Sequence, residues 1–320
     1  MIVLCDRSAV LTAIDRARSV CLSAYVLPPT VTARLTAAAR RHARVELALA
    51  RYPVAETPAE RHRLAGANRA AVAAVRRAGG RAQLISPRDP LHLKAALIDD
   101  RIAYLDDRNW SDDGPQTIVA DDLPGDVAIV RDALARRPAA GEHLRTVKPE
   151  SLALERSVLD RAGGERLDVA SESFGIGPVY DALVARAAEH RATRLLVCDR
   201  ELGEAQRHAA RTGREPVELR ALDRLARDGV DVRVTSAGEK LAVAGMRAWV
   251  GSTNATRDWG STAHQLDWGM TFQDPSIVGA LRHRFQSIWN SARAFASVRA
   301  MTVPTSTPST SATTRAVSAT

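Results

Sequence analysis

The chain has 320 residues and carries 45 Lys plus Arg against 37 Asp plus Glu, which gives a formal net charge of +8. With 45% hydrophobic and 26% charged residues, it can bury one large core or two ordinary ones, which excludes a wholly disordered or fibrous protein. The three cysteines, Cys5, Cys21 and Cys198, form no ligand-like pair, so we expect them to be reduced and buried.

Targeting and membrane signals are absent from the sequence. No apolar run reaches the roughly 18 residues of a membrane span, and Asp6 interrupts the start before a secretory signal can form. We therefore expect a cytoplasmic protein with no transmembrane segment. The positive excess is spread along the chain and allows anionic partners, either nucleic acid or lipid headgroups.

Short β-branched runs alternate with long segments rich in Ala, Arg and Leu, which is the pattern of an α/β layered fold. In chain order it predicts a strand at 20–27, a helix at 32–43, a strand at 45–50, a helix at 58–78 and a strand at 82–86. The order returns as a strand at 167–173, a helix at 178–190, a strand at 194–198, a long helix ending near Gly229 and a strand at 232–236. A last helix is predicted at 275–292.

Each element recurs about 145 to 150 residues after its counterpart, which indicates a duplicated domain. We expect two α/β halves with mixed sheets, 1–145 and 146–301, joined near 137–150 and packed about a pseudo-two-fold axis. Equivalent loops of the two halves then meet in one cleft. The Ser/Thr/Pro-rich segment 302–320 is expected to be disordered.

The main chemical motif follows the strand at 82–86. His92 and Lys94 are two residues apart, so in an extended segment they point to the same side. Asp99 comes just before a probable hairpin turn at Asp100 and Arg101, and the return strand brings Asn109 back to the same end. One ring nitrogen with an ammonium and an amide is the set that an incoming phosphoryl group requires.

These residues resemble the phospholipase D superfamily, whose signature is His-x-Lys, four residues, Asp, and then Gly-Ser-x-Asn. His92, Lys94, Asp99 and Asn109 stand at the family's spacing, whereas Asp106 and Asp107 replace the Gly-Ser pair. Asp99, beside hairpin chemistry, is expected to have a structural role.

The second half keeps only part of the signature. Gly251, Ser252 and Asn254 match the Gly-Ser-x-Asn element, and Lys240 matches the motif lysine. The position of the histidine is taken by Gly238, and the motif aspartate is missing, with Gly245 in a turn that is one residue shorter.

A carboxylate of the segment around Asp267 orients the catalytic imidazole in the family. The asparagine offset of 145 maps Asp267 onto Asp122, with Asp121 as the near alternative. We expect Asp122 to orient His92 and to fix its tautomer.

The resemblance implies a two-step phosphodiester reaction without metal or cofactor. One histidine attacks phosphorus to give a phosphohistidine, while the other protonates the leaving oxygen. His92 is then the nucleophile; the groups that hold the phosphoryl oxygens are Lys94, Asn109, Lys240, Ser252 and Asn254.

The general acid is unassigned because the second histidine is missing. His264 and Glu239 are two substitutes that stay open. A partner subunit is a less favoured source, since the second half covers the face used for such pairing, and we expect a monomer. The prediction is a phosphodiesterase or a phosphatidyl or phosphoryl transferase acting on phospholipid or nucleic acid. The alternative is a catalytically impaired module that binds phosphate, nucleic acid or lipid headgroups.

Overall fold

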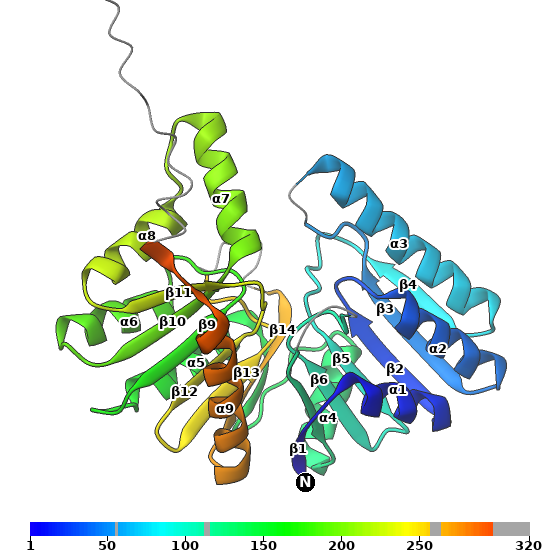
Figure 1. Ribbon diagram of the computed structural model, residues 1–320. Coiled ribbons are helices and arrows are strands. Elements are labelled where there is room, and N and C mark those ends of the chain that lie inside the picture. The colour runs from blue at the N-terminus through cyan, green and yellow to red at the C-terminus, as the bar shows by residue number, and fades with distance from the viewer. Residues whose placement is uncertain (55–56, 112–115, 257–263, 297–320) are drawn as a thin grey trace, which may run out of the picture.

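The computed structural model describes residues 1–54, 57–111, 116–256 and 264–296. The predicted tail 302–320 lies outside the described residues. Figure 1 shows two α/β bodies lying against each other, with the N-terminal half in blue to cyan and the C-terminal half in green to orange.

The first sheet has seven strands in the order β1-β7-β6-β5-β2-β3-β4. Strands β2, β3 and β4 are parallel neighbours, and the remaining pairs are antiparallel, so the sheet is mixed as predicted. Its strands are β1 (Ile2–Cys5), β2 (Ser19–Ala24), β3 (Arg44–Ala50), β4 (Arg81–Ile85), β5 (Ala95–Ile98), β6 (Ile102–Asp106) and β7 (Ile118–Asp121). The helices of this half are α1 (Arg7–Arg16), α2 (Pro29–Arg40), α3 (Pro58–Arg77) and α4 (Pro124–Leu134).

The second sheet has eight strands in the order β15-β11-β10-β9-β12-β13-β14-β8. Its strands are β8 (Leu144–Val147), β9 (Leu167–Ser171), β10 (Thr193–Cys198), β11 (Asp231–Thr235), β12 (Leu241–Ala244), β13 (Arg247–Gly251), β14 (Leu266–Phe272) and β15 (Arg293–Ala294). Its helices are α5 (Lys148–Asp160), α6 (Pro178–Ala188), α7 (Asp199–Thr212), α8 (Val217–Arg227) and α9 (Pro275–Ser291).

The strand register defines which residues of the two halves are equivalent. Strand β6 pairs Asp106 with Ile118 of β7, and β13 pairs Gly251 with Gly269 of β14. Asp106 and Gly251 are equivalent, because they are separated by the same 145 residues as the two motif asparagines. Their strand partners, Ile118 and Gly269, are therefore equivalent too, although they are 151 residues apart. The spacing is larger here than the 145 between the motif asparagines, because the loop before β14 is longer.

One of the three buried apolar clusters spans both halves. Leu97 and Val119 of the first sheet belong to the same buried cluster as Val243 and Met270 of the second. A parallel bridge between Leu91 and Leu266 also crosses the seam. The halves are thus held together by burial of apolar surface, which fixes the loops that meet above it.

Several local predictions differ from the structure. The helix expected at 32–43 is α2, three residues earlier at both ends, and the strand expected at 20–27 is β2, which ends at Ala24. The long helix expected to end near Gly229 is two helices, because α7 ends at Gly213 with a left-handed φ of 64° and Pro216 caps α8. The hairpin turn lies at Asp99 and Asp100, with φ of 53° and 55°, one residue before the expected place.

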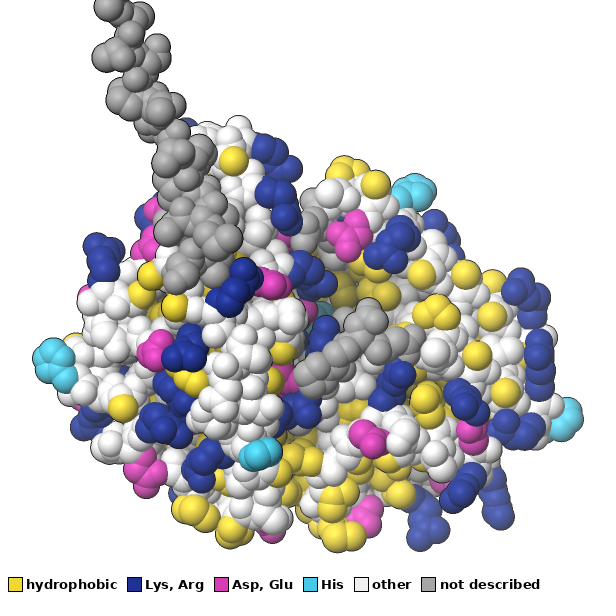
Figure 2. Space-filling model, viewed as in Figure 1, with side chains coloured by type: hydrophobic (Ala, Val, Ile, Leu, Met, Phe, Trp, Pro, Cys, Tyr) yellow, Lys and Arg dark blue, Asp and Glu magenta, His cyan; other side chains and the backbone are white. Residues whose placement is uncertain are grey.

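All three cysteines are free, but only Cys198 is buried; Cys5 and Cys21 are partly exposed. Basic side chains are scattered over the viewed face instead of forming one patch (Figure 2). In the described part of the chain, no helix is both long enough and apolar enough to cross a bilayer.

Candidate active site

His92 lies at the seam between the halves. Its backbone N–H donates to Leu266 O at 2.9 Å, and its side chain is 16% exposed. The imidazole Nδ1 lies 3.0 Å from Oδ2 of Asp267, a residue of β14 in the other half. The side chain of Tyr25 packs edge-on against the ring, with centroids 5.2 Å apart.

Asp267 is held as a carboxylate. Burial alone would raise its pKa, but the interactions with His92 and Lys94 and the hydrogen bond from Ser252 outweigh burial and lower the pKa. The Ser252 hydroxyl donates to Oδ1, and Gln265 Nε2 donates to Oδ2 at 3.2 Å. An ionised carboxylate facing Nδ1 makes this nitrogen the protonated one.

The other ring nitrogen then has a lone pair. Nε2 of His92 lies 2.9 Å from Lys94 Nζ, which also donates to His92 O at 2.9 Å. Burial, and next the charge of Lys94, lower the pKa of His92, so the neutral imidazole is favoured. Burial also lowers the pKa of Lys94 to about 8. His92 Nε2 therefore carries the lone pair that a nucleophile needs, and the ammonium of Lys94 lies against it.

Lys240 lies in the same electrostatic cluster but is fully engaged by the protein. Its Nζ lies 2.8 Å from Glu172 Oε2 and donates to the carbonyl oxygens of Asp107 at 3.1 Å and Gly238 at 3.3 Å. Burial would raise the pKa of Glu172, but Lys240 and then Arg200 lower it to about 2. All three ammonium protons of Lys240 thus have protein acceptors.

The two motif asparagines have matching roles. Asn109 Oδ1 accepts from the backbone N–H groups of Tyr25 at 3.2 Å and Val26 at 3.3 Å. Asn254 Oδ1 accepts from Ser173 N–H at 3.3 Å. Because the carbonyl end is fixed in each case, the amide NH2 group is the end left to serve a ligand.

A cavity of about 360 Å³ opens over these residues. Of the predicted site residues, His92, Asn109 and Asn254 line it, whereas Lys94 and Lys240 are each 1% exposed and lie outside the lining. The lining residues are Tyr25, Val54, Glu60, Leu64, His92, Asn109, Lys148, Glu172, Ser173, Arg200, Glu201, Glu204, Asn254, Thr256 and Gln265.

The prediction that Asp122 orients His92 is wrong. Asp122 is exposed and forms an ion pair with the N-terminal amine of Met1, and the contact with His92 is made by Asp267 itself. The alternative, Asp121, accepts from a backbone N–H at its own strand end. The error has a physical reason: the orienting carboxylate comes from the opposite half, and a loop of different length invalidates the constant offset.

The counterpart of the His92–Asp267 pair is missing both its histidine and its carboxylate. Since Ile118 and Gly269 are equivalent, Gln116 is the equivalent of Asp267, and Gly238 stands where a second histidine would lie. Within the described residues, Gln116 Oε1 is buried without a hydrogen-bond partner. A Cβ atom on Gly238 would lie 3.2 Å from Glu172 Oε1, so the carboxylate of Glu172 borders the space of the missing ring.

The remaining predicted residues lie elsewhere. Ser252 is completely buried and supports Asp267, not a ligand. Glu239 is buried in contact with Arg284 at 2.5 Å and Thr117 at 2.8 Å, and His264 is exposed and outside the cavity lining. Neither is placed to serve as the acid. Asp99 Oδ1 accepts from two backbone N–H groups at 2.7 and 2.8 Å, a structural arrangement.

Asp106 and Asp107, in place of the Gly-Ser pair, are buried behind the site. Desolvation raises the pKa of Asp106 to about 7 and that of Asp107 well above its ordinary value. They therefore contribute less negative charge than two ionised carboxylates would, but Asp107 still gives its carbonyl oxygen to Lys240.

Sequence reasoning missed Lys148, a buried lysine of the cavity wall. One signal could have found it: of the 45 basic residues, only Lys94, Lys148 and Lys240 are lysines, and all others are arginines. The structure brings all three lysines to the same region.

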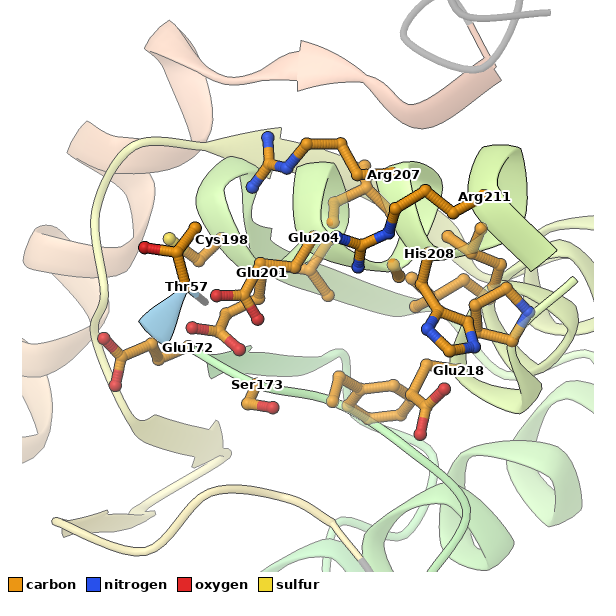
Figure 3. Close-up of a pocket in the computed structure, with 17 residues that line it drawn as sticks. Thr57, Glu172, Ser173, Cys198, Glu201, Glu204, Arg207, His208, Arg211 and Glu218 are labelled. Carbon is orange, nitrogen blue, oxygen red and sulfur yellow. The ribbon is translucent and has the colours of Figure 1, made fainter. Parts of the chain in front are cut away.

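A second cavity of about 570 Å³ adjoins the first. The two share Glu172, Ser173, Glu201 and Glu204. Figure 3 shows Glu172 and Glu201 near one end of this cavity and Arg211 and His208 toward the other. In the described ranges, no group of three or more His, Cys, Asp and Glu side chains is arranged to hold a metal ion.

Comparisons with known proteins agree with this architecture. No protein-family model matches the chain, and no curated protein matches it. The structure of phosphatidylserine synthase from Haemophilus influenzae Rd KW20 is similar over 92% of this chain and 87% of that protein, with a TM-score of 0.62 and 8% identity. Polyphosphate kinase from Porphyromonas gingivalis matches 89% of this chain with a TM-score of 0.57 and 14% identity, and the chain spans 50% of its length.

The fold is therefore that of a duplicated α/β protein with one shared cleft. More specifically, the chain has a phospholipase D-like fold, as the sequence predicts.

Proposed function

We propose that this protein is a phosphoryl-transfer enzyme that cleaves a phosphodiester through a phosphohistidine on His92. The observation that carries the proposal is the series of contacts Asp267, His92 and Lys94 at the wall of a polar cavity. The similarity to a phosphatidylserine synthase and a polyphosphate kinase supports the same class of chemistry.

In the first step, the lone pair of His92 Nε2 forms a bond to phosphorus, and the bond to the leaving oxygen breaks with both electrons going to that oxygen. Asp267 stabilises the positive charge that develops on the imidazole. Lys94 releases Nε2 and donates to a phosphoryl oxygen. In the second step, water or an acceptor alcohol attacks phosphorus, the P–N bond breaks, and the proton of the attacking group goes to solvent.

The missing second histidine determines which leaving groups react well. His92 is the one histidine among the described residues that line the cavity, and Gly238 supplies no acid. A positioned general acid contributes about 10²- to 10⁴-fold. We therefore expect efficient turnover only for leaving groups that need no proton, such as aryl oxides and phosphates.

The carboxylates of the cavity lining favour a small phosphodiester over nucleic acid. Glu60, Glu201 and Glu204 are among the lining residues. Carboxylates repel further phosphates along a polyanion, whereas a headgroup of phospholipid type carries one phosphodiester and hydroxyl or ammonium groups that such a wall can bind.

The test uses bis(p-nitrophenyl) phosphate, whose leaving group needs no acid. We expect p-nitrophenol release and, after alkaline quenching, an aryl phosphoryl adduct that peptide mass spectrometry locates on His92. His92→Ala should lose both signals. His283→Ala, a matched control at an exposed histidine of α9, should keep them. Equal turnover in wild type and His92→Ala, with no adduct, would refute the proposal.

A second candidate function is a non-catalytic module that binds a phosphate-bearing ligand. The loss of both members of the counterpart of the His92–Asp267 pair, at Gly238 and Gln116, supports it. The double variant Gly238→His with Gln116→Glu separates the two functions. A gain of turnover by about 10²-fold or more would indicate that only the acid is lacking. Unchanged turnover, with phosphate binding that survives His92→Ala, would favour the binding module.

A further inference from the structure

The distribution of lysine in this chain is unusual. Only Lys94, Lys148 and Lys240 occur among the 45 basic residues, and their residues are 1%, 6% and 1% exposed. All other basic residues are arginines, and of those that the structure describes only Arg186 is comparably buried. A lysine therefore stands only where a compact ammonium is buried at the seam between the halves, and Lys148 shares this property with the two motif lysines.

The backbone places Lys148 beside His92. Lys148 is the first residue of α5, and its N–H donates to Gln265 O at 3.1 Å, while the N–H of His92 donates to Leu266 O at 2.9 Å. Lys148 and His92 thus flank the start of β14 from its two sides. Both side chains line the same cavity.

The three ammonium groups differ in how the protein satisfies them. Lys240 has Glu172 as a counter-ion and two carbonyl oxygens as acceptors, and Lys94 contacts His92 at two atoms. Lys148 Nζ donates to the neutral hydroxyl of Thr256 at 3.0 Å. Among the described residues, Lys148 pairs with no carboxylate.

A buried ammonium with one neutral acceptor has protons and charge available for an anion. Burying a charge is unfavourable unless it is paired. Although glutamates also line the cavity, none of the described carboxylates is ion-paired with Lys148, and Asn254 and the His92 ring lie in the same lining. A tetrahedral oxyanion bound there would pair with Lys148 and face the nucleophile.

We propose that Lys148 is a further substrate-binding residue, which holds a phosphoryl oxygen next to His92, and that Lys240 is instead a structural cation neutralised by Glu172. The proposal rests on the proposed function for the role of His92. It replaces the expected ligand Lys240 with a residue outside the family motif.

The first test is binding of orthovanadate, a tetrahedral phosphate analogue, and needs no turnover. Lys148→Met should weaken orthovanadate binding by about 10- to 100-fold, the range for a charge-assisted hydrogen bond. Lys148→Arg should keep part of the affinity. The control is Arg7→Gln, since Arg7 begins α1 as Lys148 begins α5 and donates to Ser111 O at 3.1 Å. It should leave the affinity unchanged.

The second test measures the wild-type protein, and the variants are needed only to assign its signals. With ¹⁵N-labelled lysine, the three side-chain ammonium groups give at most three side-chain signals, which the variants assign. Orthovanadate should shift the Lys148 signal most and leave that of Lys240 nearly unmoved. A shift confined to Lys240, or equal affinity of Lys148→Met and wild type, would overturn the proposal.

The outcomes also separate this proposal from the proposed function. A phosphoryl adduct on His92 that forms as fast in Lys148→Met as in wild type would refute the role of Lys148 alone. Orthovanadate binding that depends on Lys148, in a protein that never forms the adduct, would support the anion site and refute the enzyme.

Discussion

Removal of the Glu172 carboxylate should destabilise the protein by an amount that the structure sets. Glu172 is the counter-ion of the buried Lys240, at 2.8 Å, and its side chain is 20% exposed. Its pKa falls from 4.5 to about 2, and each unit corresponds to about 1.4 kcal/mol, so ionised Glu172 contributes about 3 kcal/mol to folding at pH 7. Because the folded pKa is the lower one, this stability is present above pH 4.5 and is lost as the pH falls toward 2.

The assay is thermal unfolding of Glu172→Gln at pH 7. A loss of about 3 kcal/mol should lower Tm by about 6 to 10 °C in a chain of this size. The double variant Glu172→Gln with Lys240→Met should regain much of the loss, because no unpaired charge stays buried. Glu201→Gln is the control: Glu201 also contacts Arg200, at 3.2 Å, but at a more exposed site, and should cost less than about 1 kcal/mol. An unchanged Tm in Glu172→Gln, or additive losses in the double variant, would refute the reasoning.

Three further predictions concern the site and its support. Asp267→Asn should lower kcat for an aryl phosphodiester by about 10²- to 10⁴-fold with little change in KM, because the tautomer of His92 is no longer fixed. A rise in KM with kcat unchanged would contradict this. Turnover should fall above about pH 8, where Lys94 loses its proton, and Lys94→Arg should move that limb to higher pH in the measured profile. The carboxylate of Glu155 is buried without a hydrogen-bond partner, and burial raises its pKa to about 8. Since the unfolded chain ionises at a lower pH than the folded protein, the free energy of unfolding should fall as the pH rises from 4.5 to 8. Urea titrations should therefore show Glu155→Met gaining stability over wild type between pH 5 and 8, and the absence of such a gain would contradict the prediction.

Much of the fold follows from local patterns in the sequence. The strands at 45–50 and 82–86 and the helix at 58–78 lie within a residue or two of β3, β4 and α3, because apolar periodicity and the Gly79 stop signal agree with the tertiary packing. The single long helix before Gly229 was wrong, since its amphipathic pattern continues across a break that Gly213 and Pro216 impose.

The candidate site was only partly predictable. Spacing in one segment was enough to select His92 and Lys94, because both lie on one short stretch of chain. The partner of His92 could not be found by an offset, since Asp267 reaches it from the other half after a loop of different length. Contacts between the halves depend on how the halves pack, and they produce neither a hydrophobic periodicity nor a fixed spacing that could be recognised in the sequence.

Because all three lysines are buried, the outer surface of the folded protein exposes no ε-amine. Amine reagents too large to enter the cavity should find only the α-amine of Met1, which is itself engaged by Asp122. The endoproteinase that cuts after lysine should meet no accessible bond until the halves separate. Labelling or cleavage at the lysines would then report the separation of the halves directly, because the arginines of the surface react with neither the amine reagent nor the lysine-specific endoproteinase.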